Sequence, residues 1–153
     1  MMPRRSFLWR ALLGATGLAA VPSVIVQMRR PLLWIADSNP CVAFAIQLLA
    51  RHCGFADSHI VECKRVAIKR LQTEVPKPKL LVTDYWSGHM RGNEFIRLAR
   101  HVFPTTKVIL FSTGVGNLRS WSDLAGLDAP IPDAIVEKPS TGKLMAALCQ
   151  MGR

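Results

Sequence analysis

The sequence predicts an α/β fold, namely a doubly wound, five-stranded parallel sheet with helices on both faces. Along residues 31–153, five short apolar runs alternate with segments that have helical patterning. These runs lack the polar–apolar alternation of a half-exposed strand, which is typical of strands covered by helices on both faces. The length of 153 residues suits a single domain, and half of the residues are hydrophobic, which is enough for one core.

The first half of the predicted sheet begins with a wholly apolar strand at 32–36. Pro40 then opens a helix over 40–52, since proline fits the first helical turn, and Gly54 lies just beyond its end. A short second strand is expected at 59–62. A helix over 64–72 follows, with apolar side chains on one side. Its opposite, polar side is expected to carry Lys64, Arg65 and Lys69.

The second half starts with an apolar strand at 80–83, which ends at Asp84. A helix is expected over 94–102, because Pro104 cannot continue it. A fourth strand follows at 108–112, and the weakest helical pattern of the chain lies at 118–124. After a loop with two prolines, a fifth strand is expected at 134–136 and a last helix at 141–151.

Residues 1–30 differ in character from the rest, because they hold five arginines and no acid. Arg4-Arg5, followed by Phe7-Leu8 and an uncharged stretch over 11–28, resembles a twin-arginine export signal. Two other interpretations stay open: an ordinary N-terminal extension, or a true start at Met28. We therefore divide the chain into a targeting-like or dispensable segment, 1–30, and a domain, 31–153. The segment makes membrane attachment or export an alternative to a cytoplasmic location.

The charge of the domain itself is only mildly positive. Of the formal net charge of +10, residues 1–30 supply half, and the remaining residues hold 15 bases and 10 acids. The simplest interpretation is a solvated surface, so a nucleic-acid partner is not expected.

Four cysteines occur, at positions 41, 53, 63 and 149, and none forms a Cys-x-x-Cys pair. Within the predicted helix, Cys41 and Cys53 would lie roughly 18 Å apart, too far for a disulfide. We expect free thiols, at least partly buried, in a reducing compartment.

Polar side chains follow four of the predicted strands at the points where the strands end. They are Asp37-Ser38, Asp84, Ser112-Thr113 and Glu137-Lys138-Pro139. The carboxyl ends of parallel strands share one edge of the sheet, where the sites of doubly wound folds lie. The sequence therefore predicts a site with two carboxylates, a hydroxyl and an ammonium.

In these motifs the chain resembles the receiver domains of bacterial response regulators, including the stand-alone chemotaxis type. The resemblance covers residues 32–148 and implies the flavodoxin-like strand order 2-1-3-4-5. Its matching pieces are Ile35-Ala36-Asp37-Ser38-Asn39-Pro40, Leu81-Val82-Thr83-Asp84-Tyr85, Gly92, Lys107-Val108-Ile109-Leu110-Phe111-Ser112 and Val136-Glu137-Lys138-Pro139.

The resemblance implies that Asp84 is the phosphoacceptor, whose carboxylate forms an acyl phosphate. Lys138 would pair with the phosphoryl oxygens as a point charge, and Ser112 would form a hydrogen bond with the phosphoryl group. The bond between Lys138 and Pro139 would be cis, as in the family.

The resemblance also implies a Mg²⁺ site formed by Asp37, Asp84 and the backbone carbonyl of Trp86. The family usually has a second acid where this chain has Ser38, and a hydroxyl is a weaker, neutral ligand. We therefore expect weak Mg²⁺ binding, with Ser38 a doubtful ligand.

Two further departures concern the response to phosphate. Ser87-Gly88 replaces the usual Met-Pro pair, and Ile135 replaces the aromatic residue that usually moves on activation.

One hypothesis is a single-domain response regulator, phosphorylated by a histidine kinase or phosphotransfer protein and acting on an unknown output protein. The alternatives are an unphosphorylated pseudo-receiver that binds partners and a shortened relative of a DNA-binding regulator. An enzyme is not expected beyond self-phosphorylation and dephosphorylation at Asp84, because no nucleophile–base pair, P-loop or zinc set occurs.

Overall fold

The computed structural model describes residues 32–61, 63–73, 77–86, 89–115, 121, 125 and 130–153. Within these residues, five strands form one parallel sheet in the order β2-β1-β3-β4-β5. This confirms the predicted α/β class and strand order. The twin-arginine-like segment, 1–30, and most of the predicted helix at 118–124 lie outside the described residues.

The predicted strands and helices within the described residues all occur, each within two residues of its expected bounds. The strands are β1 (Leu32–Ala36), β2 (Asp57–Ile60), β3 (Leu80–Thr83), β4 (Lys107–Ser112) and β5 (Ala134–Glu137). The helices are α1 (Pro40–His52), α2 (Lys64–Thr73), α3 (Gly92–Val102) and α5 (Thr141–Gly152). In the part of the chain that the structure describes, no helix is both long and apolar enough to cross a membrane.

Strand β2 lies two residues earlier than the apolar pattern indicated. It is an edge strand whose side chains are largely exposed, so its apolar character does not set its position. Pairing with β1 sets the position of β2, since Leu32 lies opposite Asp57 and Ile35 opposite Ile60. Backbone hydrogen bonding, rather than burial, thus decides the bounds of this strand.

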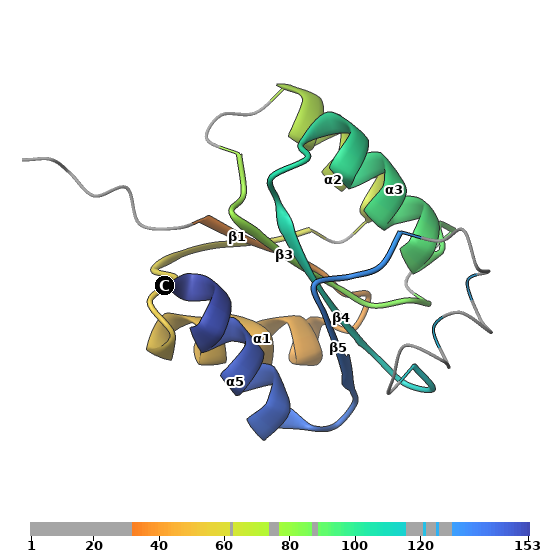
Figure 1. The fold of residues 1–153 in the computed structure, drawn as a ribbon. Coiled ribbons are helices and arrows are strands. Elements are labelled where there is room, and N and C mark those ends of the chain that lie inside the picture. Colours follow the sequence, from red (N-terminus) through yellow and green to blue (C-terminus); the bar gives the residue numbers. More distant parts are fainter. Residues whose placement is uncertain are drawn as a thin grey trace, which may run out of the picture.

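The sheet is covered on both faces by helices, as Figure 1 shows, with α1 and α5 on one face and α2 and α3 on the other. Alternate residues of β1 supply the two cores. Leu33 and Ile35 pack with α1 and α5, while Leu32 and Trp34 pack with α2 and α3. Fully burying an aliphatic side chain of this size contributes about 1.5–3 kcal/mol, so these two cores hold the helices against both faces of the sheet.

Register brings the ends of the strands together at one edge. Ala36 of β1 lies opposite Thr83 of β3, and the amide of Asp84 donates to the carbonyl of Ala36 at 3.1 Å. On the other side, the amide of Lys138 donates to the carbonyl of Ser112, also at 3.1 Å. The residues that follow β1, β3, β4 and β5 therefore meet at the same rim of the sheet.

Helix α1 starts where the sequence indicates, for two local reasons. Pro40 stands in its first turn, and the side chain of Asn39 accepts hydrogen bonds from the amides of Cys41 and Val42 at 3.0 and 3.3 Å. These amides would otherwise lack partners within the helix. The cap directs the chain away from the sheet edge immediately after Asp37 and Ser38.

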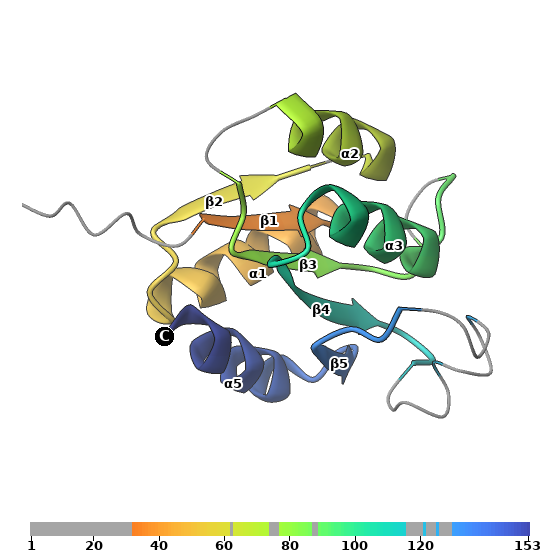
Figure 2. The same cartoon turned by 45° about the horizontal axis from the view of Figure 1, so that its top comes forward.

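The expectation of four free thiols is wrong. Cys53, after α1, and Cys149, in α5, form a disulfide with their Cα atoms 4.4 Å apart. Helix geometry excludes a bond between Cys41 and Cys53 along α1, but this bond joins the end of α1 to α5, which packs on the same face of the sheet (Figure 2). Cys41 and Cys63 are free, and Cys41 is exposed rather than buried.

The disulfide closes a chain segment with a sequence separation of 96, so its removal should destabilise the domain. Replacing both Cys53 and Cys149 by Ala is expected to lower the free energy of unfolding by about 2–4 kcal/mol. Urea denaturation with and without reductant measures the effect. Cys41→Ala is the matched control, and a reductant effect that persists in the double variant would contradict the assignment.

Candidate functional site

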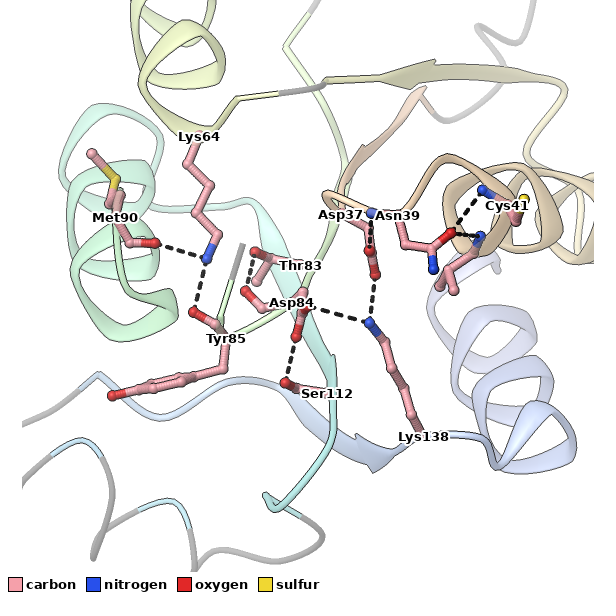
Figure 3. Close-up of polar contacts among 11 residues, drawn as sticks. Asp37, Asn39, Cys41, Lys64, Thr83, Asp84, Tyr85, Met90, Ser112 and Lys138 are labelled. Carbon is pink, nitrogen blue, oxygen red and sulfur yellow. Dashed lines mark hydrogen bonds and ion pairs between the residues drawn. The ribbon is translucent and has the colours of Figure 1, made fainter. Parts of the chain in front are cut away.

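Four side chains from four strand ends meet at the carboxyl edge of the sheet. Figure 3 shows Asp37, Asp84, Ser112 and Lys138 pointing toward one another. They follow or end β1, β3, β4 and β5, respectively. The predicted juxtaposition of two carboxylates, a hydroxyl and an ammonium is therefore present in the structure.

The ammonium of Lys138 lies between the two carboxylates. Its Nζ is 2.7 Å from Oδ2 of Asp37 and 3.3 Å from Oδ2 of Asp84. The side chains of Asp37, Asp84 and Lys138 are 2%, 13% and 16% exposed. Because these groups are largely shielded from water, the ion pairs offset the repulsion that the neighbouring carboxylates would otherwise exert on each other.

Hydrogen bonds orient both carboxylates. The hydroxyl of Ser112 donates to Oδ1 of Asp84, and Lys138 contacts the other oxygen of the same group. The amide of Asn39 donates to Oδ1 of Asp37 at 2.9 Å. Both oxygens of each carboxylate thus contact a hydrogen-bond donor or an ammonium, which preorganises the pair.

The Lys138–Pro139 peptide bond is cis, as the resemblance implied. It lies directly after β5, where α5 is about to begin. The Lys138 ammonium also lies 5.5 Å from the centre of the Phe111 ring, a cation–π distance. The stem of Lys138 is thereby held on the edge of the sheet with its charge toward Asp84.

The remaining candidate residues lie nearby but do not join this cluster of contacts. Ser38 follows Asp37 and is exposed, and the side chain of Trp86 is 55% exposed. Ile135 is partly buried against the core under α2 and α3. Among the described residues, no group of three or more His, Cys, Asp or Glu side chains could hold a metal ion. Two carboxylates remain, a donor set that suits Mg²⁺ when water and carbonyl oxygens complete it.

Lys64 lies near the site in a buried position, contrary to the prediction of a solvent-exposed side chain. It was expected on the solvent side of α2, but it is only 2% exposed. Its Nζ donates to the carbonyls of Tyr85 and Met90, each at 3.0 Å (Figure 3). Lys64 lies at the i position of the buried face that Ala67 (i+3) and Leu71 (i+7) form on α2, so its charged residue type, not its helical position, suggested an exposed side chain.

The pKa of Lys64 is lowered to about 8, because burial disfavours its charged form. The negative charges of Asp84, Asp37 and Glu94 oppose this shift, and the positive charge of Lys138 adds to it. A charge buried at this position therefore remains only because backbone carbonyls and nearby carboxylates compensate for lost hydration.

No protein-family model and no curated protein matches the sequence. Solved structures do match. A signal receiver domain of an HD domain-containing protein from Pseudomonas fluorescens aligns with a TM-score of 0.66 at 20% identity, covering 80% of this chain and 94% of that one. A response regulator receiver protein from Sinorhizobium medicae aligns with a TM-score of 0.65 at 21% identity, covering 81% and 95%.

This chain has the receiver fold. A third match is a response regulator from Burkholderia pseudomallei, solved with a phosphorylated aspartic acid and a calcium ion. It aligns at a TM-score of 0.61 and 19% identity, covering 77% of this chain and 66% of that one. At these identities the likeness concerns the fold. The receiver fold of this chain carries its own polar cluster, described above, at the edge where β1, β3, β4 and β5 end.

The lowered pKa of Lys64 predicts how stability depends on pH. The folded chain has a Lys64 pKa of about 8 against an ordinary value of 10.5, so between these pH values the unfolded chain binds more protons. Stability therefore rises with pH across this window, by at most about 1.4 kcal/mol per pH unit for one group.

We expect the native chain to gain stability relative to Lys64→Met as the pH rises from about 8 to about 10. Urea denaturation at a series of pH values measures the difference. In Lys69→Met, which changes an exposed lysine of the same helix, the free energy of unfolding should depend on pH as it does in the native chain. A constant difference between the native chain and Lys64→Met would contradict the prediction.

Proposed function

We propose that this chain is a single-domain response regulator, with a receiver domain over residues 31–153. In this proposal, Asp84 accepts a phosphoryl group from a histidine kinase or phosphotransfer protein, and the domain then signals through protein contacts. One observation carries the proposal: the carboxylate of Asp84 has the hydroxyl of Ser112 on one oxygen and the ammonium of Lys138 on the other.

The chemistry follows from these contacts. A carboxylate oxygen of Asp84 attacks phosphorus and forms an O–P bond, while the bond to the donor's nitrogen or oxygen breaks and the donor leaves with the electron pair. The ammonium of Lys138 is placed to balance the negative charge of the phosphoryl oxygens. The Ser112 hydroxyl, released from Asp84, can donate to one of those oxygens.

A divalent cation belongs to this proposal. Asp37, Asp84 and the carbonyl of Trp86 would hold Mg²⁺, which would neutralise charge on the entering phosphoryl group. The neutral, exposed Ser38 supplies no charge to such a site. We therefore propose weak Mg²⁺ binding, with Lys138 already balancing part of the charge of both carboxylates.

An unphosphorylated pseudo-receiver is the second candidate, and two observations favour it. Ser38 stands in place of an acid, and Lys138 contacts Asp37 at a shorter distance than Asp84. In that case the domain would act only as a binding surface. The exposed apolar side chains of Phe44 and Leu48 on α1 would suit protein contacts in either case.

A kinase partner places the receiver domain in the cytoplasm in this proposal. If residues 1–30 are used as an anchor or export signal, the domain would lie at or beyond a membrane instead. Mass spectrometry of the native N-terminus distinguishes these alternatives, because it shows whether the segment is present, cleaved or replaced by a start at Met28.

The proposed function predicts a single covalent phosphoryl group on Asp84. Incubation with acetyl phosphate and Mg²⁺ should add the mass of one phosphoryl group to the native chain, measured on the intact protein. Asp84→Asn should gain none, because an amide is not the nucleophile that a carboxylate is. Asp57→Asn, at an exposed acid of β2, is the matched control and should react like the native chain. A native chain that never gains this mass, even at high Mg²⁺, favours the pseudo-receiver.

The absence of an acid at position 38 predicts that introducing one raises the affinity for Mg²⁺. Ser38→Asp should tighten Mg²⁺ binding by about tenfold, because a third carboxylate adds charge for a hard cation. Tryptophan fluorescence can follow the titration, since Trp86 adjoins the site. Ser58→Asp, on the edge strand β2, adds the same charge elsewhere and should leave the affinity near the native value. Equal affinities of Ser38→Asp and the native chain would refute this description of the site.

A further inference from the structure

The observation that carries a further inference is a buried ammonium behind the Asp84 site. Lys64 begins α2 and is 2% exposed, whereas Arg65 and Lys69 on the same helix are exposed. Removing an ammonium from water is costly unless hydrogen bonds and opposite charges compensate. The partners of Lys64 therefore show which part of the molecule its charge stabilises.

Both hydrogen-bond partners belong to the segment that joins Asp84 to α3. The ammonium binds the carbonyl of Tyr85, directly after Asp84, and the carbonyl of Met90, directly before the cap of α3. One side chain thus ties together the two ends of this connection. As Figure 3 shows, Lys64 approaches from α2, on the side of Asp84 opposite to Lys138.

The same carbonyl of Tyr85 has a second donor. The amide of Gly92 donates to it at 2.9 Å, which uses the second lone pair of the oxygen. A Cβ at Gly92 would lie 3.0 Å from Cα of Tyr85, so a larger residue could not keep this close approach. Lys64 and Gly92 together hold the backbone of Tyr85 in one position.

Trp86 directly follows Tyr85, and its carbonyl is the one that the proposed site would use. Its side chain is exposed, so side-chain burial does not fix its backbone. The contacts of Lys64 on either side of it, at Tyr85 and Met90, do constrain it.

We propose that Lys64 is a positioning residue for the Asp84 site, whose buried ammonium holds the backbone carbonyls of Tyr85 and Met90 and so preorganises the carbonyl oxygen of Trp86, directly after Tyr85, for a divalent cation. This inference rests on the proposed function, because it assigns a support to the same site. Lys64 acts through the backbone and touches no reacting group. Residues that orient metal ligands typically change metal affinity by 10- to 100-fold when they are removed.

The test compares Mg²⁺ binding in four proteins of full length: the native chain, Lys64→Met, Lys69→Met and Leu71→Ala. Lys64→Met keeps the length of the side chain and removes its charge and donors. Lys69→Met makes the same change at an exposed position of α2. Leu71→Ala removes buried apolar surface from that helix, so it lowers stability without touching the ammonium. Urea denaturation ranks the stabilities, and calorimetric titration with MgCl₂ gives each Kd.

We expect Lys64→Met to raise the Kd for Mg²⁺ by about tenfold or more, with Lys69→Met and Leu71→Ala within about twofold of the native chain. Hydrogen exchange of the Gly92 amide, which donates to the carbonyl of Tyr85, should accelerate in Lys64→Met alone. If Lys64→Met does not fold, Lys64→Gln, which keeps a hydrogen-bond donor, replaces it with the same expected direction. A native-like Kd in the Lys64 variant overturns the inference, as does an equal loss in Leu71→Ala or a native chain that does not bind Mg²⁺.

These measurements separate the inference from the proposed function. Mg²⁺ affinity is read without any phosphoryl donor. A native chain that binds Mg²⁺, loses that affinity in Lys64→Met and yet gains no phosphoryl group would refute phosphorylation at Asp84 while supporting the role of Lys64. The reverse result, phosphorylation with Mg²⁺ affinity unchanged in Lys64→Met, would refute only the role of Lys64.

Discussion

The contact of Lys138 with Asp37 and Asp84 is the interaction on which the rest of the site depends. Lys138 and Asp37 are 101 residues apart in the sequence, and only the parallel sheet brings them to 2.7 Å. Without the ammonium, two carboxylates shielded from water would stand side by side, an arrangement that raises the free energy of the charged pair. The two carboxylates can therefore lie together at this edge because Lys138, directly after β5, places a positive charge beside them.

The second buried ammonium extends this balance to the other side of Asp84. Lys64 has the negative charges of Asp84, Asp37 and Glu94 around it, and these oppose the lowering of its pKa by burial. Its hydrogen bonds go to the backbone rather than to those carboxylates. The ammonium of Lys64 therefore holds backbone carbonyls in place, whereas the ammonium of Lys138 contacts the two carboxylates directly.

Different interactions connect the helices on the two faces of the sheet. On the face of α1 and α5, a disulfide between Cys53 and Cys149 joins the end of α1 to α5. On the face of α2 and α3, the link to the polar edge is the ammonium of Lys64. The carboxylate edge between them keeps Asp84, Ser112 and Lys138 in contact, while the position after Asp37 carries the neutral Ser38.

The sequence by itself determined the layered fold and the four residues of the polar cluster. Apolar runs of strand length predict buried parallel strands, and such strands end on one edge, so the sequence alone predicts that Asp37, Asp84, Ser112 and Lys138 lie together. Only the tertiary structure decided the place of Lys64, the Cys53–Cys149 disulfide and the start of β2. Periodicity and propensity describe one element at a time. These three features depend on which parts of the chain pack against one another: the carbonyls of Tyr85 and Met90 against the first residue of α2, α5 against α1, and the backbone of an edge strand against β1.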